Sequence, residues 1–246
     1  MISFNAEQRF IVTGASSGIG QGVALLLNKL GATVIGIGRN QDRLDALKAQ
    51  AEFPENIFLQ RKDLTENISE LPAYVKSLKE IYGKFCGLAC CAGIAQIQPL
   101  RSLELKDVQS VFDINYFAPL MMLKGFADRR NNIGAGSSAV MISSAAAVVF
   151  DRGHTSYCGS KSALCASCKS IAKEIASAGI RLNCILPSDI QTPMSDTVQD
   201  LRSEFSSKYP MGIGSVEDVA NTAAFLLSNK AKWITGQNYV VDCASF

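Results

Sequence analysis

Two residue types that can move a proton, Tyr157 and Lys161, lie four positions apart at the start of a helical pattern over 155–178. Side chains at i and i+4 share one helix face about one turn apart. A phenol has a pKa of about 10, and a neighbouring ammonium group favours the phenolate and lowers that value. The pair could exchange a proton with a substrate oxygen, although an exposed tyrosine and lysine without any role would show the same spacing.

A glycine-rich segment near the N-terminus has the context of a phosphate-binding turn. It follows an apolar run at 9–13 and opens a helical pattern at 18–30. Glycines allow the backbone to approach a pyrophosphate, and a helix N-terminus offers unused N–H groups. A tight turn without a ligand is the alternative. We predict dinucleotide contacts from Gly14, Ser16, Ser17, Gly18, Ile19 and Gly20.

The residue after the second apolar run, 33–38, bears on the choice of cofactor. Arg39 follows that run, and no acidic residue precedes Asp42. An acidic side chain here would bind the ribose 2′-hydroxyl of NAD, whereas an arginine suits the 2′-phosphate of NADP. The sequence therefore predicts NADP(H), and a solvated surface arginine is the alternative.

Strand and helix patterns alternate along the chain, and these elements must position the residues named above. Continuous apolar strands between helices are typical of a parallel sheet covered on both faces. We expect an α/β, Rossmann-like doubly wound fold in a single domain over 1–246. The expected strands are 9–13, 33–38, 57–60, 87–92, 139–143, 181–186 and 238–241, and the expected helices are 18–30, 41–51, 68–82, one or two within 105–130, 155–178 and 216–227.

Composition excludes several classes of protein. The net charge is +2 and 48% of the residues are hydrophobic. This charge gives no strong electrostatic field that would attract nucleic acid or a membrane surface. No signal peptide and no apolar run of about 20 residues is present, so a cytoplasmic location is expected. The eight cysteines indicate reduced thiols, and the single histidine, His154, lies outside any ligand spacing, so no metal site is predicted.

Taken together, the motifs resemble the short-chain dehydrogenase/reductase family in its shorter single-domain branch. Residues 13–20 match its T-G-x-x-x-G-x-G motif, and residues 157–161 match Y-x-x-x-K. Ser144 precedes Tyr157 by the thirteen residues typical of the catalytic serine, and Asn115 matches the helix asparagine. Residues 187–192 are similar to the P-G-x-I-x-T segment that holds the nicotinamide amide.

The resemblance implies a role for each matched residue. Tyr157 is the expected general acid/base, and Lys161 the group that binds the nicotinamide ribose and lowers the pKa of Tyr157. Ser144 polarises the substrate oxygen, with Ser143 as the alternative if the register shifts by one, and Asn115 holds a water. The family pattern adds cofactor contacts at Asp63, Leu64, Ala92, Gly93, Tyr157, Lys161, Pro187, Ile190 and Thr192.

Three positions depart from the family pattern. The family's N-N-A-G is Cys90-Cys91-Ala92-Gly93 here, and a thiol cannot reproduce the hydrogen bonding of an amide. Ser188 replaces a glycine, and residues 242–244 replace D-G-G. None of these changes removes an expected catalytic group.

Substrate and partners are less determined by the sequence. The chain is similar to 3-oxoacyl-(acyl-carrier-protein) reductases, and Arg129 and Arg130 could dock a carrier, but Ala178 stands where such enzymes can have arginine. Another ketone, a sugar or a secondary-metabolite intermediate stays equally open. His154 either faces the substrate or belongs to a turn. A substrate lid is expected over 188–211, with residues that line a pocket or pack as a helix: Met194, Val198, Leu201, Phe205 and Tyr209.

Two other functions use the same residues. One is an NADP-binding protein without turnover, and the other is an epimerase or dehydratase that uses the Tyr157–Lys161 pair. The resemblance also implies a homodimer or homotetramer formed through the fourth and fifth helices and the C-terminal strand.

Overall fold

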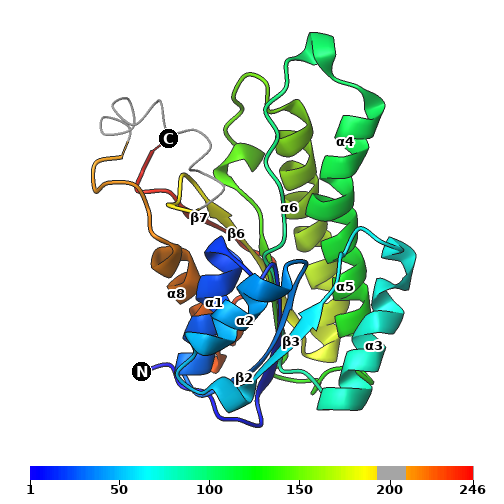
Figure 1. The fold of residues 1–246 in the computed structure, drawn as a ribbon, viewed down its shortest axis with the longest axis vertical. Coiled ribbons are helices and arrows are strands. Elements are labelled where there is room, and N and C mark those ends of the chain that lie inside the picture. The colour runs from blue at the N-terminus through cyan, green and yellow to red at the C-terminus, as the bar shows by residue number, and fades with distance from the viewer. Residues whose placement is uncertain (193–208, 246) are drawn as a thin grey trace.

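A parallel β-sheet organises the protein. The computed structural model describes residues 1–192 and 209–245, and within them seven strands form one sheet in the order β3-β2-β1-β4-β5-β6-β7 (Figure 1). Every neighbouring pair is parallel. The strands are β1 Arg9–Thr13, β2 Thr33–Gly38, β3 Ile57–Arg61, β4 Gly87–Cys90, β5 Ser138–Ile142, β6 Arg181–Pro187 and β7 Asn238–Val241.

Helices cover both faces of this sheet, as Figure 1 shows. Apolar side chains of α1, α2 and α8 pack on one face, and those of α3, α5 and α6 on the other. In β1, Phe10 and Val12 contact the first group while Ile11 contacts the second, as strand alternation requires. The helices are α1 Gly18–Lys29, α2 Gln41–Ala49, α3 Leu71–Tyr82, α4 Leu105–Phe112, α5 Ala118–Ala127, α6 Thr155–Ile175 and α8 Val216–Leu227.

The doubly wound α/β fold is therefore confirmed, and its strand order reverses at β1. The chain first builds outward through β2 and β3 and then crosses back to place β4 on the other side of β1. Ligands of such sheets bind beyond the carboxyl ends of the strands at this reversal. The glycine-rich turn after β1 and the Cys90–Gly93 segment after β4 meet there.

The region 105–130 contains two α-helices joined by a π-helical turn, Asp113–Phe117. Pro119 in the first turn of α5 has no N–H, so the carbonyl of Asn115 has no donor four residues on. The interruption places Asn115 in the interior, where it is 1% exposed. The sequence allowed one or two helices here, and it did not indicate a π-turn.

Several expected boundaries were wrong by a few residues. β4 ends at Cys90 and not at 92, because the N–H groups of Cys91 and Ala92 donate to the Thr13 hydroxyl. The helix expected over 155–178 ends at Ile175 and continues as a 3₁₀ turn before Gly179, whose φ is +76°. Helix 41–51 ends at Ala49, and residues 68–70 form a 3₁₀ turn ahead of α3.

None of the described helices combines the length and apolar character that crossing a bilayer would require.

Gly125 marks the closest contact between α3 and α5. A Cβ there would lie 2.8 Å from Val75 Cβ and 2.9 Å from Pro72 Cα. We expect Gly125→Ala to lower the free energy of unfolding by about 1–3 kcal/mol through overpacking. In Gly159→Ala, in α6, the added Cβ would lie 3.5 Å from the Phe112 ring, an ordinary contact. This variant should raise the free energy of unfolding by about 1 kcal/mol through helix propensity. Urea unfolding of both variants measures these free energies. Equal changes in the two variants would contradict the close packing of α3 and α5 at Gly125.

Candidate active site

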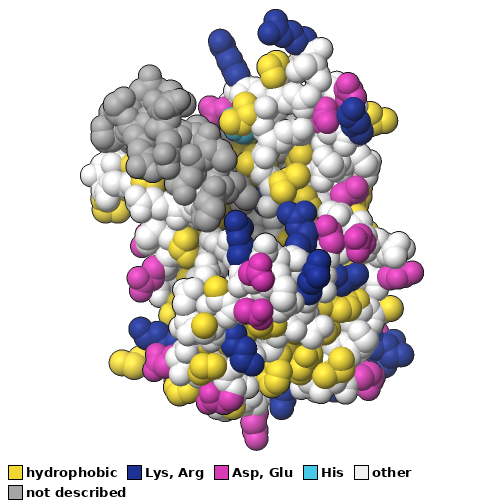
Figure 2. All heavy atoms as spheres, in the orientation of Figure 1, with side chains coloured by type: hydrophobic (Ala, Val, Ile, Leu, Met, Phe, Trp, Pro, Cys, Tyr) yellow, Lys and Arg dark blue, Asp and Glu magenta, His cyan; other side chains and the backbone are white. Residues whose placement is uncertain are grey.

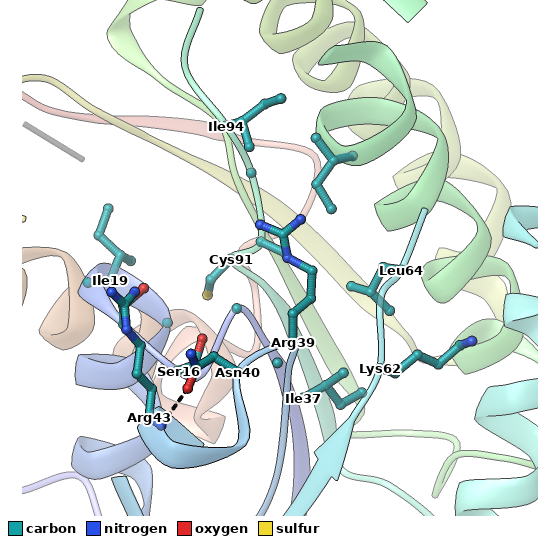
Figure 3. A pocket seen from close by; sticks show the side chains of 18 of the residues that line it. Ser16, Ile19, Ile37, Arg39, Asn40, Arg43, Lys62, Leu64, Cys91 and Ile94 are labelled. Carbon is teal, nitrogen blue, oxygen red and sulfur yellow. Dashed lines mark hydrogen bonds between the residues drawn. The ribbon is translucent and has the colours of Figure 1, made fainter. Parts of the chain in front are cut away.

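A cleft opens at the carboxyl ends of β1, β2 and β4 (Figure 3). Gly14 and Ala92 form its floor, and a Cβ on Gly14 would lie 2.8 Å from the Ala92 nitrogen. Six predicted turn residues and four further predicted residues, Arg39, Leu64, Ala92 and Gly93, line it, together with Thr192. The structure therefore brings together most of the residues expected to hold a dinucleotide.

The glycine-rich turn is shaped for close approach of a ligand. Gly14 and Gly18 have φ of +67° and +55°, which L side chains rarely adopt. A Cβ on Gly20 would lie 2.3 Å from the Gly14 carbonyl oxygen. Ser17 precedes α1 without a side-chain capping bond, so no cap occupies the first N–H groups of that helix. These groups and the positive end of the helix dipole fit a pyrophosphate.

Thr13, at the end of β1, connects the glycine-rich turn to the segment after β4 through hydrogen bonds. Its Oγ1 accepts hydrogen bonds from the N–H groups of Cys91 and Ala92, at 3.1 Å and 3.2 Å. The replacement of the family's asparagines therefore leaves these backbone groups satisfied. Cys90 points into the core at 3% exposure, whereas Cys91 lines the cleft.

At the outer end of the cleft, Arg39 and Asp63 form an ion pair across 3.6 Å. The carboxylate of Asp63 also accepts hydrogen bonds from the N–H and hydroxyl of Thr65. Burial alone would raise the pKa of Asp63, but these hydrogen bonds and the Arg39 charge outweigh it and hold the pKa below its ordinary value. Asp63 thus lies at the edge of the cleft, while Leu64 forms its wall.

Lys161 brings a charge into the interior beside this cleft. The side chain is 5% exposed, and its Nζ donates to the Ile142 carbonyl at 2.9 Å. Burial lowers the pKa of Lys161 to about 8. The Nζ lies 5.8 Å from the centroid of the Tyr157 ring, so the two predicted partners are neighbours.

Asn115 lies beside Gly93, near this lysine. Its amide oxygen accepts from Ile94 N–H at 2.9 Å, and its Nδ2 donates to the Ile94 carbonyl and to Ser160 Oγ. A Cβ on Gly93 would lie 2.9 Å from Asn115 Oδ1 and 3.4 Å from Lys161 Nζ. Gly93 is therefore the spacer that lets Asn115 and Lys161 face the same small volume.

The two adjacent serines separate into different roles. Ser143 is buried, and its hydroxyl donates to the Lys161 carbonyl at 2.9 Å. Ser144 is on the opposite side of the backbone, where its hydroxyl accepts from Ala146 N–H and interacts with the phenol of Tyr157. The geometry favours Ser144 over Ser143 as the group beside the tyrosine.

The expected lowering of the Tyr157 pKa is not found in this structure. Burial raises the pKa of Tyr157 above its ordinary value, and the hydrogen bond with Ser144 only partly opposes this. Burial is the largest cause, and the Lys161 ammonium group donates to Ile142 and forms no hydrogen bond with the phenol oxygen among the described residues.

The segment 187–192 closes the cleft on the far side of the turn. Pro187 ends β6, and Ile190 is buried and forms a β-bridge with Gly214. Thr192 Cγ2 would lie 3.4 Å from a Cβ on Gly18. Ser188, which replaces a glycine, contacts the Tyr209 hydroxyl at 3.0 Å.

Of the lid expected over 188–211, only its two ends can be placed. Tyr209 is 3% exposed and donates to the Asp189 carboxylate, so it packs. Met194, Val198, Leu201 and Phe205 lie outside the described residues.

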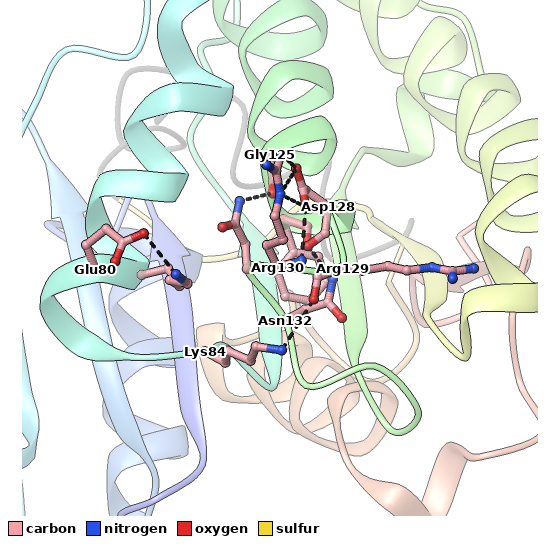
Figure 4. Close-up of polar contacts among 10 residues, drawn as sticks. Glu80, Lys84, Gly125, Asp128, Arg129, Arg130 and Asn132 are labelled. Atoms are coloured by element: carbon pink, nitrogen blue, oxygen red, sulfur yellow. Dashed lines mark hydrogen bonds and ion pairs between the residues drawn. The ribbon is translucent and has the colours of Figure 1, made fainter.

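The remaining residues predicted from the sequence lie next to Tyr157 or away from the cleft. His154 is the N-cap residue of α6 without a capping side-chain bond, and its ring lies 6.4 Å from that of Tyr157. Arg129 and Arg130 follow α5 at the amino edge of the sheet, opposite to the cleft, and Arg130 pairs with Asp128 at 2.6 Å (Figure 4). Within one chain, these arginines therefore do not border the site entrance.

Some cleft residues were missed by sequence reasoning. Arg43 lies four residues after Arg39 in the sequence, and this proximity was the available signal. Ile94 and Ile114 carry no polar atom, so only their positions beside the matched Gly93 and Asn115 could have indicated them. The cleft residues not predicted are Ile37, Gly38, Asn40, Arg43, Lys62, Cys91, Ile94 and Ile114.

Replacing Lys161 by methionine tests the buried charge. With a pKa of about 8 in the folded chain and 10.5 as the model value, the unfolded chain binds more protons between these limits, so this residue makes stability rise with pH. We expect Lys161→Met to be the more stable protein near pH 7. Its advantage should shrink by on the order of 3 kcal/mol between about pH 8 and 10.5.

Urea unfolding at several pH values measures this difference, which includes the coupling of Lys161 to the neighbouring thiols of Cys91, Cys165 and Cys184. A constant difference across the window would contradict a buried, destabilised ammonium group.

Comparison with known proteins agrees with this geometry. A family model described as enoyl-(acyl carrier protein) reductase matches residues 14–243. The chain is 33% identical to the 3-oxoacyl-(acyl-carrier-protein) reductase of Rickettsia bellii over 237 residues, 96% of this chain and 95% of that protein. It is 31% identical to the NAD-dependent glycerol dehydrogenase of Listeria innocua over 237 residues, 94% of this chain and 91% of that protein.

Solved structures show the same architecture. A short-chain type dehydrogenase/reductase from Mycobacterium ulcerans has a TM-score of 0.90 and 33% identity, covering 99% of this chain and 91% of that chain. A short-chain dehydrogenase/reductase from Brucella melitensis, glucose/ribitol dehydrogenase in its description, has a TM-score of 0.93 and 25% identity, covering 100% and 99%. With its sequence matched over nearly its whole length, the chain belongs to the short-chain dehydrogenase/reductase family.

Proposed function

We propose that the protein is an NADP(H)-dependent oxidoreductase that transfers a hydride between the nicotinamide and a carbonyl or secondary alcohol. The observation that carries the proposal is the convergence of Ser144, Tyr157 and the buried Lys161 beside a cleft lined by a glycine-rich turn. A phenol and a hydroxyl that lie beside a buried ammonium group suit proton transfer to a substrate oxygen.

The residues of the cleft fit the cofactor in a defined order. The turn from Gly14 to Gly20 would hold the pyrophosphate, and Arg39 the 2′-phosphate. Leu64 and Asp63 would contact the adenine, and Lys161 the nicotinamide ribose. Ala92, Gly93, Pro187, Ile190 and Thr192 would border the nicotinamide. When bound, the cofactor supplies or accepts the hydride.

The protein side chains handle the proton. During reduction, the Tyr157 hydroxyl gives its proton to the carbonyl oxygen as the carbonyl carbon becomes an alcohol carbon. Ser144 Oγ donates a hydrogen bond to the same oxygen and stabilises its developing negative charge. Lys161 keeps a positive charge near the phenol, and Asn115 holds the water through which the proton is replaced. Oxidation of an alcohol reverses these roles.

The preference for NADP(H) rests on Arg39 at the end of β2, where no acidic residue is available for a ribose 2′-hydroxyl. The Listeria innocua relative is described as NAD-dependent, so the family alone does not decide the cofactor. The relatives named for acyl-carrier substrates support a ketone that is free or attached to a carrier protein.

We also propose a homodimer or homotetramer in the cytoplasm, with the whole chain acting as one cofactor-binding domain. Exposed apolar side chains at α4, the π-turn and β7 support self-association: Leu105, Phe117 and Val240. All eight cysteines are free, which suits a reducing compartment.

Substitution of the serines and the tyrosine tests the mechanism. Tyr157→Phe should lower kcat about a hundred- to ten-thousand-fold, because the general acid is lost. Ser144→Ala should lower it about a hundred- to a thousand-fold. Ser143→Ala is the matched control, which should cost about 1 kcal/mol of stability and leave most of the activity.

NADPH consumption with a panel of ketones and diketones measures the rates. Activity retained in Tyr157→Phe would contradict the mechanism. If NADPH raises the Tm of the protein but no ketone in the panel is reduced, the binding-only function replaces the proposal.

A further inference from the structure

A second arginine, Arg43, lines the end of the cleft where the ribose 2′-phosphate is proposed to bind. Arg39 follows β2 and Arg43 lies in the first turn of α2, so both come from one short connection. Figure 3 shows the Arg39 side chain on the Leu64 side of the cleft and the Arg43 side chain on the Ile19 side, with Asn40 and Ser16 between them. The two guanidinium groups thus flank one opening.

The charges around this opening differ in how far they are neutralised. Arg39 lies 3.6 Å from the Asp63 carboxylate and shares its charge with that group. Among residues 1–192 and 209–245, no acidic side chain forms an ion pair with Arg43. A phosphate monoester has a charge of about −1.5 to −2 near pH 7. Arg39 alone, already paired with Asp63, leaves much of that charge without a partner.

Lys62 is a less suitable second partner than Arg43. Its Nζ lies 5.4 Å from the centroid of the Tyr74 ring, and Figure 3 shows this side chain directed away from the centre of the cleft. Figure 2 shows dark blue Lys and Arg side chains beside the hollow on this face, with magenta Asp and Glu side chains in the same region. Within it, Arg43 combines a planar donor group with a position in the cleft wall.

The position of Arg43 is determined by the start of its helix. Asn40 Oδ1 accepts the Arg43 N–H at 2.9 Å, and Leu44 next to it is fully buried against the sheet. Because the Asn40 cap already uses this backbone N–H, the side chain and not the peptide group is available to an anion. The guanidinium therefore starts from a fixed backbone beside the end of β2.

We propose that Arg43 is a second arm of a two-arginine clamp that binds the ribose 2′-phosphate together with Arg39 and selects NADP(H) over NAD(H). This inference rests on the proposed function, which assigns the cofactor. The bidentate donor geometry of two guanidinium groups matches the phosphate oxygens. Arg39 binds from the adenine side, and Arg43 from the side of the glycine-rich turn.

Arg43→Ala, with Arg61→Ala as the matched control, tests the clamp. Arg61 is an exposed arginine at the end of β3 that does not line the cleft. Calorimetric binding of adenosine 2′,5′-bisphosphate and adenosine 5′-phosphate separates the 2′-phosphate from the rest of the nucleotide. We expect Arg43→Ala to weaken the bisphosphate about ten- to a hundred-fold and the monophosphate less than about two-fold. Arg61→Ala should change neither.

Two results would overturn the clamp. Unchanged bisphosphate binding in Arg43→Ala would remove the residue from the site, and equal weakening of both ligands would place it at the pyrophosphate. The same measurements on Arg39→Ala distinguish a failure of the clamp from a failure of the NADP(H) assignment. If the wild-type protein binds both ligands equally, the assignment of NADP(H) fails. If Arg39→Ala discriminates but Arg43→Ala does not, only the clamp fails. Unchanged Tm values show that the variants are folded.

Discussion

The burial of the Lys161 ammonium group is the constraint on which the site depends. A charge in the interior is costly unless hydrogen-bonding partners surround it, and here the Ile142 carbonyl accepts from its Nζ. This bond fixes α6 against the end of β5. The Ser143 hydroxyl adds a second link by donating to the Lys161 carbonyl. With Ser143 turned inward, the next residue, Ser144, faces outward beside Tyr157. The ammonium group and the backbone carbonyl of Lys161 thus join α6 to the end of β5, where Ser144 and Tyr157 lie beside each other.

The opposite wall of the site depends on the interruption between α4 and α5. The π-turn carries Asn115 into the interior, where both ends of its amide bond the Ile94 backbone, and places Ile114 in the cleft. Gly93 leaves the space between Asn115 and Lys161 that a methyl group would fill. The same close approach of backbone is repeated at Gly14 and Ala92. The cleft is therefore defined by missing side chains as much as by the groups that line it.

The sequence predicted the parallel sheet, the cleft and most of its residues, because these follow from strand periodicity and from motifs with fixed spacing. It failed where a contact joins distant segments. The Thr13 hydroxyl shortened β4, and Pro119 with Asn115 produced the π-turn. The burial that raises the pKa of Tyr157 and the direction of the Lys161 side chain are tertiary properties that i,i+4 spacing does not contain. Arg43 was overlooked because its role depends on where α2 begins.

A crystal structure of the protein with NADPH is the most direct test of the proposed cofactor and catalytic site. We predict that the nicotinamide ribose lies within hydrogen-bonding distance of Lys161 Nζ and that the nicotinamide lies beside Ser144 and Tyr157. We also expect the pyrophosphate at the N-terminus of α1 and the 2′-phosphate at Arg39. NADPH bound elsewhere, or in this cleft with its nicotinamide directed away from Tyr157, would contradict the proposed function.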